Sequence, residues 1–225
     1  MSYRVVRLGV VSLPVAALLW GCSAGPDFVA KDEPWRKQEE LACLSSGAVR
    51  ETAYIRSSRT ALGGPSEYCG ATKPFEMAAT SDGRVGLQPA AFVGCPMIPQ
   101  IDDWVANVVQ PAARQTLGAE LAELKVAASY SCRAMNHVSG AKLSEHGHAN
   151  AIDISSFKLA DGHVITVKGG WNGTPGEQAF LRQVRAGSCR DFTTVLGPGA
   201  DAHHDDHFHL DLARHGSDGL KRICK

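Results

Sequence analysis

The sequence predicts an α+β fold in which helices flank a small antiparallel sheet and disulfides stabilise the domain. Three observations lead to this prediction. The 225 residues are 44% hydrophobic and 20% charged, which is typical of a globular domain with an apolar core. Stretches with strand character dominate the second half of the chain, and helical stretches lie between them. Six of the seven cysteines lie beyond residue 40, where they can pair with one another.

The charge composition argues against nucleic acid as a partner. Lysine and arginine together number 23, as do aspartate and glutamate, so the formal net charge is zero. Domains that bind nucleic acids usually carry a basic surface. We therefore expect recognition to depend on a local cleft and not on a charged surface.

The N-terminus has the pattern of an export signal. Two arginines precede the apolar run 8–20, which is too short to span a bilayer as a helix. The run ends at Leu19-Trp20-Gly21-Cys22, which resembles a bacterial lipobox, although Trp20 replaces the usual small residue. We predict a signal peptide over residues 1–21, a lipidated tether over 22–42 and a folded domain over 43–225.

The lipid on Cys22 would hold the protein to a membrane of the cell envelope, facing the periplasm. Ser23 stands where some lipoproteins have the aspartate that retains them at the inner membrane, so we expect the outer membrane. The alternative is an ordinary secretory signal that is cut nearby and leaves Cys22 as a free thiol. In both cases the mature chain enters an oxidising compartment.

The other six cysteines form an even set, which predicts three disulfides in an exported protein. Their spacing does not determine the pairing. We expect pairs that each enclose one block of the chain, namely Cys43–Cys69, Cys95–Cys132 and Cys189–Cys224. A cysteine-ligated metal site is the alternative, and the absence of any Cys-x-x-Cys pair disfavours it.

The first half of the domain combines short elements with one helical stretch. Residues 43–94 are rich in turn residues, and we expect them to pack as short elements on the main domain. Apolar residues recur with a helical period over 101–110. Pro111 predicts a kink there or the start of a second turn that runs to Leu117. A strand is predicted over 123–130.

The second half begins with a predicted hairpin. Residues 151–157 and 163–167 are rich in β-branched residues, and Asp161-Gly162 between them favours a tight turn. Thr174 is a candidate cap of the following helix, because Thr-Pro-Gly-Glu precedes an apolar face. That face consists of Phe180, Leu181 and Val184. The last two strands are predicted over 192–196 and 207–212.

Six of the nine histidines lie in two short windows, residues 144–153 and 203–209. His207 and His209 are two apart in a predicted strand, so their side chains would point to the same face. Such clustering is unusual for histidines that only face solvent. It favours a site in which imidazole groups converge.

Zinc readily binds imidazole nitrogen and carboxylate oxygen, and catalytic zinc sites commonly have three protein ligands and one open position. Two histidines and one aspartate meet this requirement. His146 can lie in the loop that leads into the strand carrying Asp153, and His209 would come from the neighbouring strand. The sequence therefore predicts a Zn²⁺ site.

These windows resemble the motifs of the zinc peptidases grouped as lysostaphin, D-Ala-D-Ala metallopeptidase and hedgehog-like proteins (the LAS group). The first motif of that group is Ser-x-His-x-x-Gly-x-Ala-x-Asp, and the second is His-x-His. The matching residues are Ser144, His146, Ala149 in place of glycine, Ala151, Asp153, His207 and His209. The resemblance implies a LAS-type core with zinc held by His146, Asp153 and His209.

A longer set of motifs resembles the bacterial extensin-like C-terminal family. The matching segments are Tyr130-Ser-Cys-Arg133, Leu143-Ser-Glu-His146, Ala151-Ile-Asp153, Val195-Leu-Gly-Pro198 and Asp206-His-Phe-His209. The resemblance extends from about Cys43 to Cys224. The chain lacks the proline-rich repeats of a structural wall protein.

The resemblance also implies roles beside the zinc. His207 would stabilise the tetrahedral intermediate or carry a proton. The base would be His204, His207 or Asp206, and the sequence does not choose among them. Arg133 would face the cleft and bind a substrate carboxylate or carbonyl. A serine hydrolase is disfavoured because no Gly-x-Ser-x-Gly elbow is present.

An exported peptidase of this group is expected to act on peptidoglycan peptides. We predict a zinc-dependent D,D-endopeptidase that cuts D-Ala–diaminopimelate cross-links. The alternatives are a D,D- or L,D-carboxypeptidase on stem peptides, or a catalytically silent zinc-containing lipoprotein that binds the cell wall. His204, Asp206 and His207 argue against the silent protein, because a structural zinc site would not need them.

Overall fold

The computed structural model describes residues 26–58 and 62–225, together with Met1. The predicted signal peptide and Cys22 lie outside the described residues, so export and lipidation stay predictions. Within the described ranges, no helix combines the length and the apolar character that crossing a bilayer requires.

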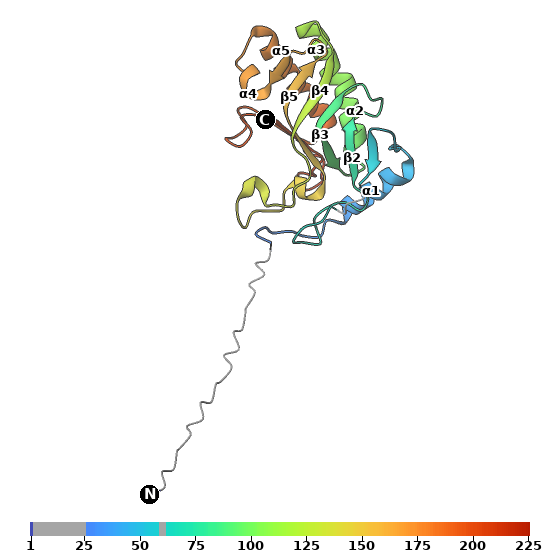
Figure 1. Cartoon of the computed structure of the whole chain (residues 1–225), viewed down its shortest axis with the longest axis vertical. Coiled ribbons are helices and arrows are strands. Elements are labelled where there is room, and N and C mark those ends of the chain that lie inside the picture. Colours follow the sequence, from blue (N-terminus) through green and yellow to red (C-terminus); the bar gives the residue numbers. More distant parts are fainter. Residues whose placement is uncertain (2–25, 59–61) are drawn as a thin grey trace.

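The described part of the chain forms one sheet of nine strands with helices packed on it (Figure 1). The strand order is β1-β2-β3-β4-β5-β8-β7-β9, and β6 pairs with β5. The strands are β1 (Ile55–Ser57), β2 (Phe75–Ala79), β3 (Gly86–Val93), β4 (Leu121–Ala128), β5 (Ala151–Leu159), β6 (Val164–Thr166), β7 (Thr194–Leu196), β8 (Phe208–Asp211) and β9 (Ile223–Cys224). The helices are α1 (Pro34–Ser46), α2 (Met97–Trp104), η1 (Val105–Val109), α3 (Gln110–Leu117), η2 (Met135–His137), η3 (Glu145–His148), α4 (Val167–Gly170) and α5 (Pro175–Asp191). The predicted α+β class is confirmed.

The sheet is mixed, and the prediction of a small antiparallel sheet was wrong. β3 pairs with β4 in parallel, as β7 does with β9. The chain between β3 and β4 passes through α2, η1 and α3, and such a helical crossover lets the next strand run in the same direction. The turn-rich segment 43–94 also contributes β1, β2 and β3 to the same sheet, which enlarges it.

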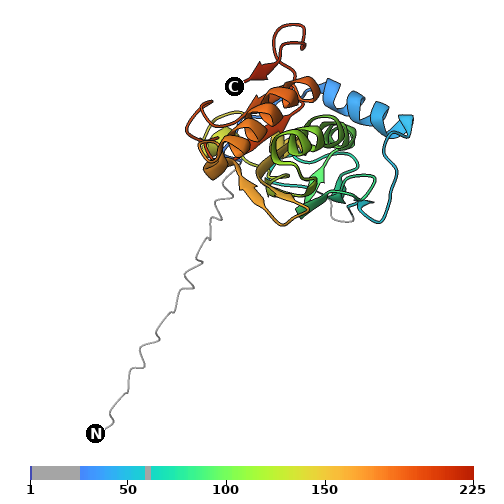
Figure 2. The same cartoon turned by 90° about the horizontal axis from the view of Figure 1, so that it is seen from above.

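The apolar core lies between the sheet and a layer of helices. Figure 2 shows α5 (orange) beside the green helical segment that contains α2 and α3, both over one face of the sheet. Trp104 is fully buried there and makes edge contacts with Phe157 and Phe192. Phe157 in turn packs against Phe180 of α5, with ring centroids 5.1 Å apart. These aromatic contacts hold the helical layer to the sheet.

The helical stretch ahead of β4 is continuous from Met97 to Leu117, with a π-helical segment, η1, at its centre. Pro111 is the second residue of α3 and lacks the backbone N–H that the interior of a continuous helix would use. A π-helical turn before a proline is one way in which a helix absorbs the lost hydrogen bond. Of the two predicted outcomes, Pro111 therefore starts a second helical segment.

Two local predictions in the second half are confirmed. β5 and β6 form an antiparallel hairpin, and Gly162 in the turn has a φ of 91°, which favours glycine. The hydroxyl of Thr174 accepts the backbone N–H of Glu177, whose carboxylate accepts the backbone N–H of Thr174. This capping box starts α5 where the sequence predicted it.

Three disulfides link the six cysteines of the described chain, and two of the predicted pairs were wrong. The bonds are Cys43–Cys95, Cys69–Cys132 and Cys189–Cys224, so only the last pair was predicted correctly. Cysteines that are neighbours in sequence are separated here by the docking of distant segments. For example, the backbone N–H of Gly70 donates to the carbonyl of Gly147. This contact places Cys69 next to a segment far along the chain, and its disulfide partner is Cys132 and not Cys43.

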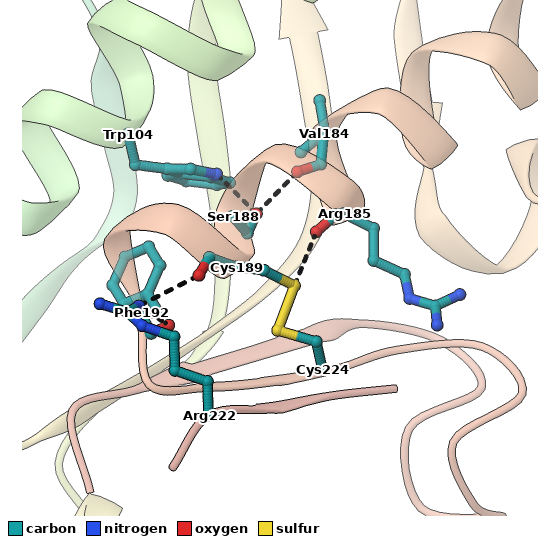
Figure 3. Close-up of a disulfide and its surroundings, with 8 residues drawn as sticks. All are labelled: Trp104, Val184, Arg185, Ser188, Cys189, Phe192, Arg222 and Cys224. Atoms are coloured by element: carbon teal, nitrogen blue, oxygen red, sulfur yellow. Dashed lines mark hydrogen bonds between the residues drawn. A yellow bond between two sulfur atoms is a disulfide. The ribbon is translucent and has the colours of Figure 1, made fainter. Parts of the chain in front are cut away.

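The Cys189–Cys224 disulfide ties the C-terminus to the end of α5 (Figure 3). Arg222 donates to the backbone carbonyls of Cys189 and Phe192, at 3.0 and 2.7 Å. On the inner side of the helix, the indole N–H of Trp104 donates to Ser188 Oγ at 2.8 Å. The last residues of the chain are therefore joined to the core through both a covalent bond and hydrogen bonds.

Part of the stretch that we expected to be a tether packs on the domain. Pro34–Ser46 form α1, whose residue Glu40 is buried and accepts the backbone N–H groups of Thr72 and Lys73, each at 2.9 Å. Phe28 is buried as well. The packed part of the chain therefore begins before Cys43.

Candidate metal centre

The pairing of β5 with β8 places two candidate ligands opposite each other. Asp153 and His209 are partners in this antiparallel register. Their strand neighbours Ile152, Ile154 and Phe208 are buried in the apolar core. Because side chains alternate along a strand, Asp153 and His209 project from the opposite face of the sheet. The third candidate, His146, lies in the short turn η3 that precedes β5.

The three predicted ligands converge. His146 Nε2 lies 3.2 Å from His209 Nδ1 and 3.1 Å from Asp153 Oδ2. His209 Nδ1 lies 2.9 Å from Asp153 Oδ1. One ligand atom of each residue lies within 4.8 Å of the others, and all three side chains are buried. Two imidazole nitrogens and one carboxylate form a donor set that zinc accepts.

In His146 and His209, one ring nitrogen points away from the common centre, and we call it the outer nitrogen. Each outer nitrogen has its own hydrogen-bond partner. His146 Nδ1 donates to the carbonyl of Ser129 at 2.5 Å. His209 Nε2 donates to the carboxylate of Asp211 at 2.9 Å. In metal sites, such partners set the orientation and the tautomer of a ligating imidazole. The nitrogens that face the common centre are therefore His146 Nε2 and His209 Nδ1, and the residues fit a bound zinc ion.

Sequence reasoning missed Asp211 and Ser129. Asp211 follows His209 by two residues in the same strand, so the period of a strand could have placed it on the same face. Ser129 follows the end of β4, and its carbonyl reaches His146 only because β4 and β5 are neighbours in the sheet. No sequence pattern indicates a backbone carbonyl of this kind.

Electrostatics at the centre favour a charged pair in the metal-free protein. Burial opposes ionisation of Asp153, but hydrogen bonds from His146 and His209 outweigh it and lower the pKa of the carboxyl. Burial also opposes the charged form of His209. The carboxylates of Asp153 and Asp211 prevail there and raise the pKa of the imidazole to about 10. At neutral pH the metal-free centre thus holds a proton on His209.

The loop that carries His146 is tightly wound. Ser144 Oγ accepts the backbone N–H of His146 at 3.4 Å and starts the turn. Ala149 ends it with a φ of 53°, in the left-handed region that favours glycine. A Cβ atom at Gly147 would come too close to the side chain of Leu143, which would have to shift.

His207 stands beside the predicted ligands, and Asp206 stands behind His207. His207 Nε2 faces the centre and lies 3.7 Å from Asp153 Oδ2. Its Nδ1 lies 2.8 Å from Asp206 Oδ1. The hydrogen bond to His207 is the main cause that lowers the pKa of Asp206, whose side chain is 61% exposed. Asp206 therefore contacts His207 and not the centre.

His204 is buried next to the other histidines. Its ring centroid lies 5.3 Å from that of His207 and 5.6 Å from that of His209. Burial lowers the pKa of His204, although Asp201 holds its Nδ1 at 2.7 Å and acts in the opposite direction. Asp201 was not singled out in the sequence, and it lies three residues before His204.

A cleft of about 590 Å³ opens onto the three candidate ligands. Arg133, His204 and His207 line it, whereas Asp206 is not part of the lining. Arg133 Nη1 donates to the neighbouring carbonyl of Ala134 at 3.2 Å. The structure therefore brings the predicted ligands, two of the three candidate bases and Arg133 to one cleft.

Comparison with protein families assigns the chain to a family. The model of the extensin-like protein C-terminus matches residues 41–225. The chain belongs to this family. The match includes all three candidate ligands and every residue discussed above as lining the cleft. A comparison with curated proteins and one with solved structures give no match.

The extensin-like domain as matched begins at residue 41, inside α1. Residues 26–40, which pack on the domain, precede the match. Within the extensin-like domain, the elements that bear on the metal centre are η3, β5 and β8, with β4 supplying the Ser129 carbonyl next to its end.

Proposed function

We propose that the protein is a zinc-dependent peptidase of the LAS type that acts on peptidoglycan peptides. One observation carries this proposal: His146, Asp153 and His209 converge in a buried centre at the floor of a cleft. The partners of their outer nitrogens, Ser129 and Asp211, support metal ligation over a plain polar cluster. A histidine outside the ligand set, His207, lies within reach of the same centre.

A zinc ion held by these three residues would polarise the scissile amide carbonyl and acidify the attacking water. His207 is the proton carrier in our proposal, because its Nε2 faces the centre while Asp206 holds its Nδ1. Nε2 accepts a proton from water as the water adds to the carbonyl carbon. The same atom then returns the proton to the leaving amine, which balances the hydrolysis.

His204 and Asp206 act through neighbouring groups in this scheme. Burial lowers the pKa of His204, which favours a neutral imidazole beside His207. Asp206 orients His207 and stabilises its protonated form. Arg133 lines the cleft and is placed to bind a carboxylate or carbonyl of the substrate.

The LAS resemblance and the predicted localisation in the cell envelope both support a peptidoglycan substrate. We propose cleavage of the D-Ala–diaminopimelate cross-link, which makes the protein a D,D-endopeptidase. Carboxypeptidase action on stem peptides uses the same chemistry and differs in the bond that is cut. A lipid at Cys22 would keep the enzyme at the outer membrane, next to its polymer.

Purified zinc-loaded protein should convert muropeptide dimers to monomers, as followed by mass spectrometry. His209→Ala should abolish this conversion. His163→Ala is the matched control, because His163 is a partly exposed histidine that pairs with Glu177 at 3.4 Å, away from the centre. Release of D-Ala from monomers would assign a carboxypeptidase instead.

A folded, zinc-loaded wild type that leaves every muropeptide intact would overturn the enzymatic proposal. Binding to sacculi without cleavage, equal in wild type and His209→Ala, would then favour a cell-wall-binding lipoprotein. Labelling with palmitate tests the anchor separately: if Cys22→Ala takes up as much label as the wild type, lipidation at Cys22 is contradicted.

A further inference from the structure

The segment ahead of the family domain docks onto the loop that carries His146. The backbone N–H of Val29 donates to the carbonyl of Ala141 at 2.8 Å, and the N–H of Leu143 donates to the carbonyl of Val29 at 2.9 Å. Phe28 is buried against Ala134 and Leu143 in a small apolar cluster apart from the main core. In Figure 1 this contact lies where the blue N-terminal trace meets the yellow segment around residue 140.

A bidentate ion pair joins the same N-terminal segment to the loop that carries His146. Arg36 Nη1 and Nη2 donate to the two carboxylate oxygens of Glu145 at 2.7 and 2.6 Å. The two side chains are only 18% and 13% exposed. Glu33 adds a second carboxylate to Arg36 at 2.7 Å. Paired contacts of this geometry are directional and are among the strong hydrogen bonds of proteins.

Glu145 contacts both ends of the ligand turn, by which we mean the η3 turn that carries His146. It immediately precedes His146, and its backbone carbonyl accepts the N–H of Asn150 at 3.0 Å. Its carboxylate also accepts from Asn150 Nδ2 at 2.7 Å. The Glu145 side chain thus holds together the residues on either side of the turn, while Arg36 holds Glu145 in place. Fixing both ends of the turn fixes the direction of the His146 side chain between them.

We propose that Arg36 is a positioning residue of the metal centre, acting on His146 through Glu145. The segment from Phe28 to Arg36, which the family match does not include, then completes the site as a wall of the cleft. Val29 and Arg36 both line that cleft. The inference rests on the metal centre of the proposed function, but it holds for any reaction at that centre and for binding alone.

The test is zinc affinity of the full mature chain, measured by competition with a chromogenic chelator. Removing Arg36 alone would leave the half-buried carboxylate of Glu145 without a cation beside it, which can destabilise the fold and complicate the comparison. The double variant Arg36→Gln/Glu145→Gln removes both charges together, and glutamine keeps the shape of the Glu145 side chain. We expect its zinc affinity to fall about tenfold, at the lower end of what losing a supporting contact around a metal ligand costs.

The matched control is Arg114→Gln/Glu120→Gln. Arg114 also donates two N–H groups to a glutamate, at 3.1 and 2.9 Å, but this pair is exposed and lies at the end of α3. Its zinc affinity should equal that of the wild type. Arg36→Lys keeps the positive charge but cannot donate two parallel hydrogen bonds to Glu145. It therefore tests the same contact if the double variant does not fold. It should lose part of the affinity.

Cobalt substitution supplies a readout of geometry. The d–d absorption bands of the cobalt-loaded double variant should shift relative to wild type, whereas those of the control should not. A folded double variant with wild-type zinc affinity and wild-type bands overturns the role of Arg36 and leaves the proposed function intact. A wild type that binds no zinc overturns the metal centre and this inference with it.

Discussion

The Nε2 atom of His209 lies 2.9 Å from the carboxylate of Asp211, two residues further along β8. The other ring nitrogen, Nδ1, lies 2.9 Å from Asp153. One imidazole thus joins a candidate metal ligand to a carboxylate outside the ligand set. Such a carboxylate makes the ligating nitrogen more basic and prevents the ring from rotating.

Asp211→Asn should weaken zinc binding by about 10- to 100-fold. Asparagine can still accept the backbone N–H of Ala213, which Asp211 Oδ1 accepts at 2.9 Å, so that contact is kept. Its NH2 group then replaces the oxygen that accepts from His209 Nε2, so the charge and the hydrogen bond to His209 are lost together. Chelator competition measures the affinity. Asp218→Asn is the control, because Asp218 accepts a backbone N–H in an exposed turn. Equal affinities of the two variants would contradict the role of Asp211.

Zinc binding at pH 7 should release about one proton, because zinc requires neutral His209. The two carboxylates raise the pKa of His209 to about 10 in the metal-free protein, despite its burial. Zinc affinity should therefore rise with pH up to about 10, by roughly tenfold per pH unit for one proton. Isothermal titration in buffers of different ionisation enthalpy counts the protons. A binding enthalpy that is independent of the buffer would show that His209 is already neutral.

His207→Gln should lower kcat/KM on muropeptide dimers by about 10²- to 10⁴-fold, the usual contribution of a proton carrier. Asp206→Asn should cost less, about tenfold, because Asp206 only holds His207. In the double variant the loss should equal that of His207→Gln alone. Additive losses would mean that Asp206 acts on the substrate directly.

The disulfides should differ in their effect on the metal. Replacing Cys69 and Cys132 by serine should reduce stability by about 4 kcal/mol, as should replacing Cys189 and Cys224, because they span 63 and 35 residues. Urea unfolding measures this cost. Only the first replacement should weaken zinc binding, since Gly70 next to Cys69 contacts the ligand turn at Gly147. Equal zinc affinity in both variants would contradict this coupling.

Ser188→Ala should reduce the free energy of unfolding by about 1–3 kcal/mol, because it leaves the buried indole N–H of Trp104 without its acceptor (Figure 3). Ser45→Ala is the control: Ser45 also donates its hydroxyl to a helical carbonyl, but it is exposed. Thermal or urea unfolding measures both. A Ser188→Ala protein as stable as the control would show that the indole finds another acceptor.

The convergence of the three candidate ligands could be predicted because each of the two motifs that supply them is local. His146 and Asp153 lie seven residues apart, and the spacing of His207 and His209 follows the period of a strand. Asp211 obeys the same period and could have been predicted. Ser129 and Arg36 could not, because a backbone carbonyl and a distant arginine reach the site only after β4, β5 and the N-terminal segment have packed together.

The sequence by itself determined the α+β class, the Asp161-Gly162 hairpin, the Thr174 cap and the residues that converge on one centre. The first three features depend on turn chemistry and on hydrophobic period, which act over a few residues. The residues of the centre stand out because they cluster in two short windows of the sequence. Only the tertiary structure decided the mixed sheet, the Cys43–Cys95 and Cys69–Cys132 bonds, and which candidate base faces the centre. Each of these depends on contacts between segments far apart in the chain, and packing free energy, which no local pattern contains, selects among such contacts.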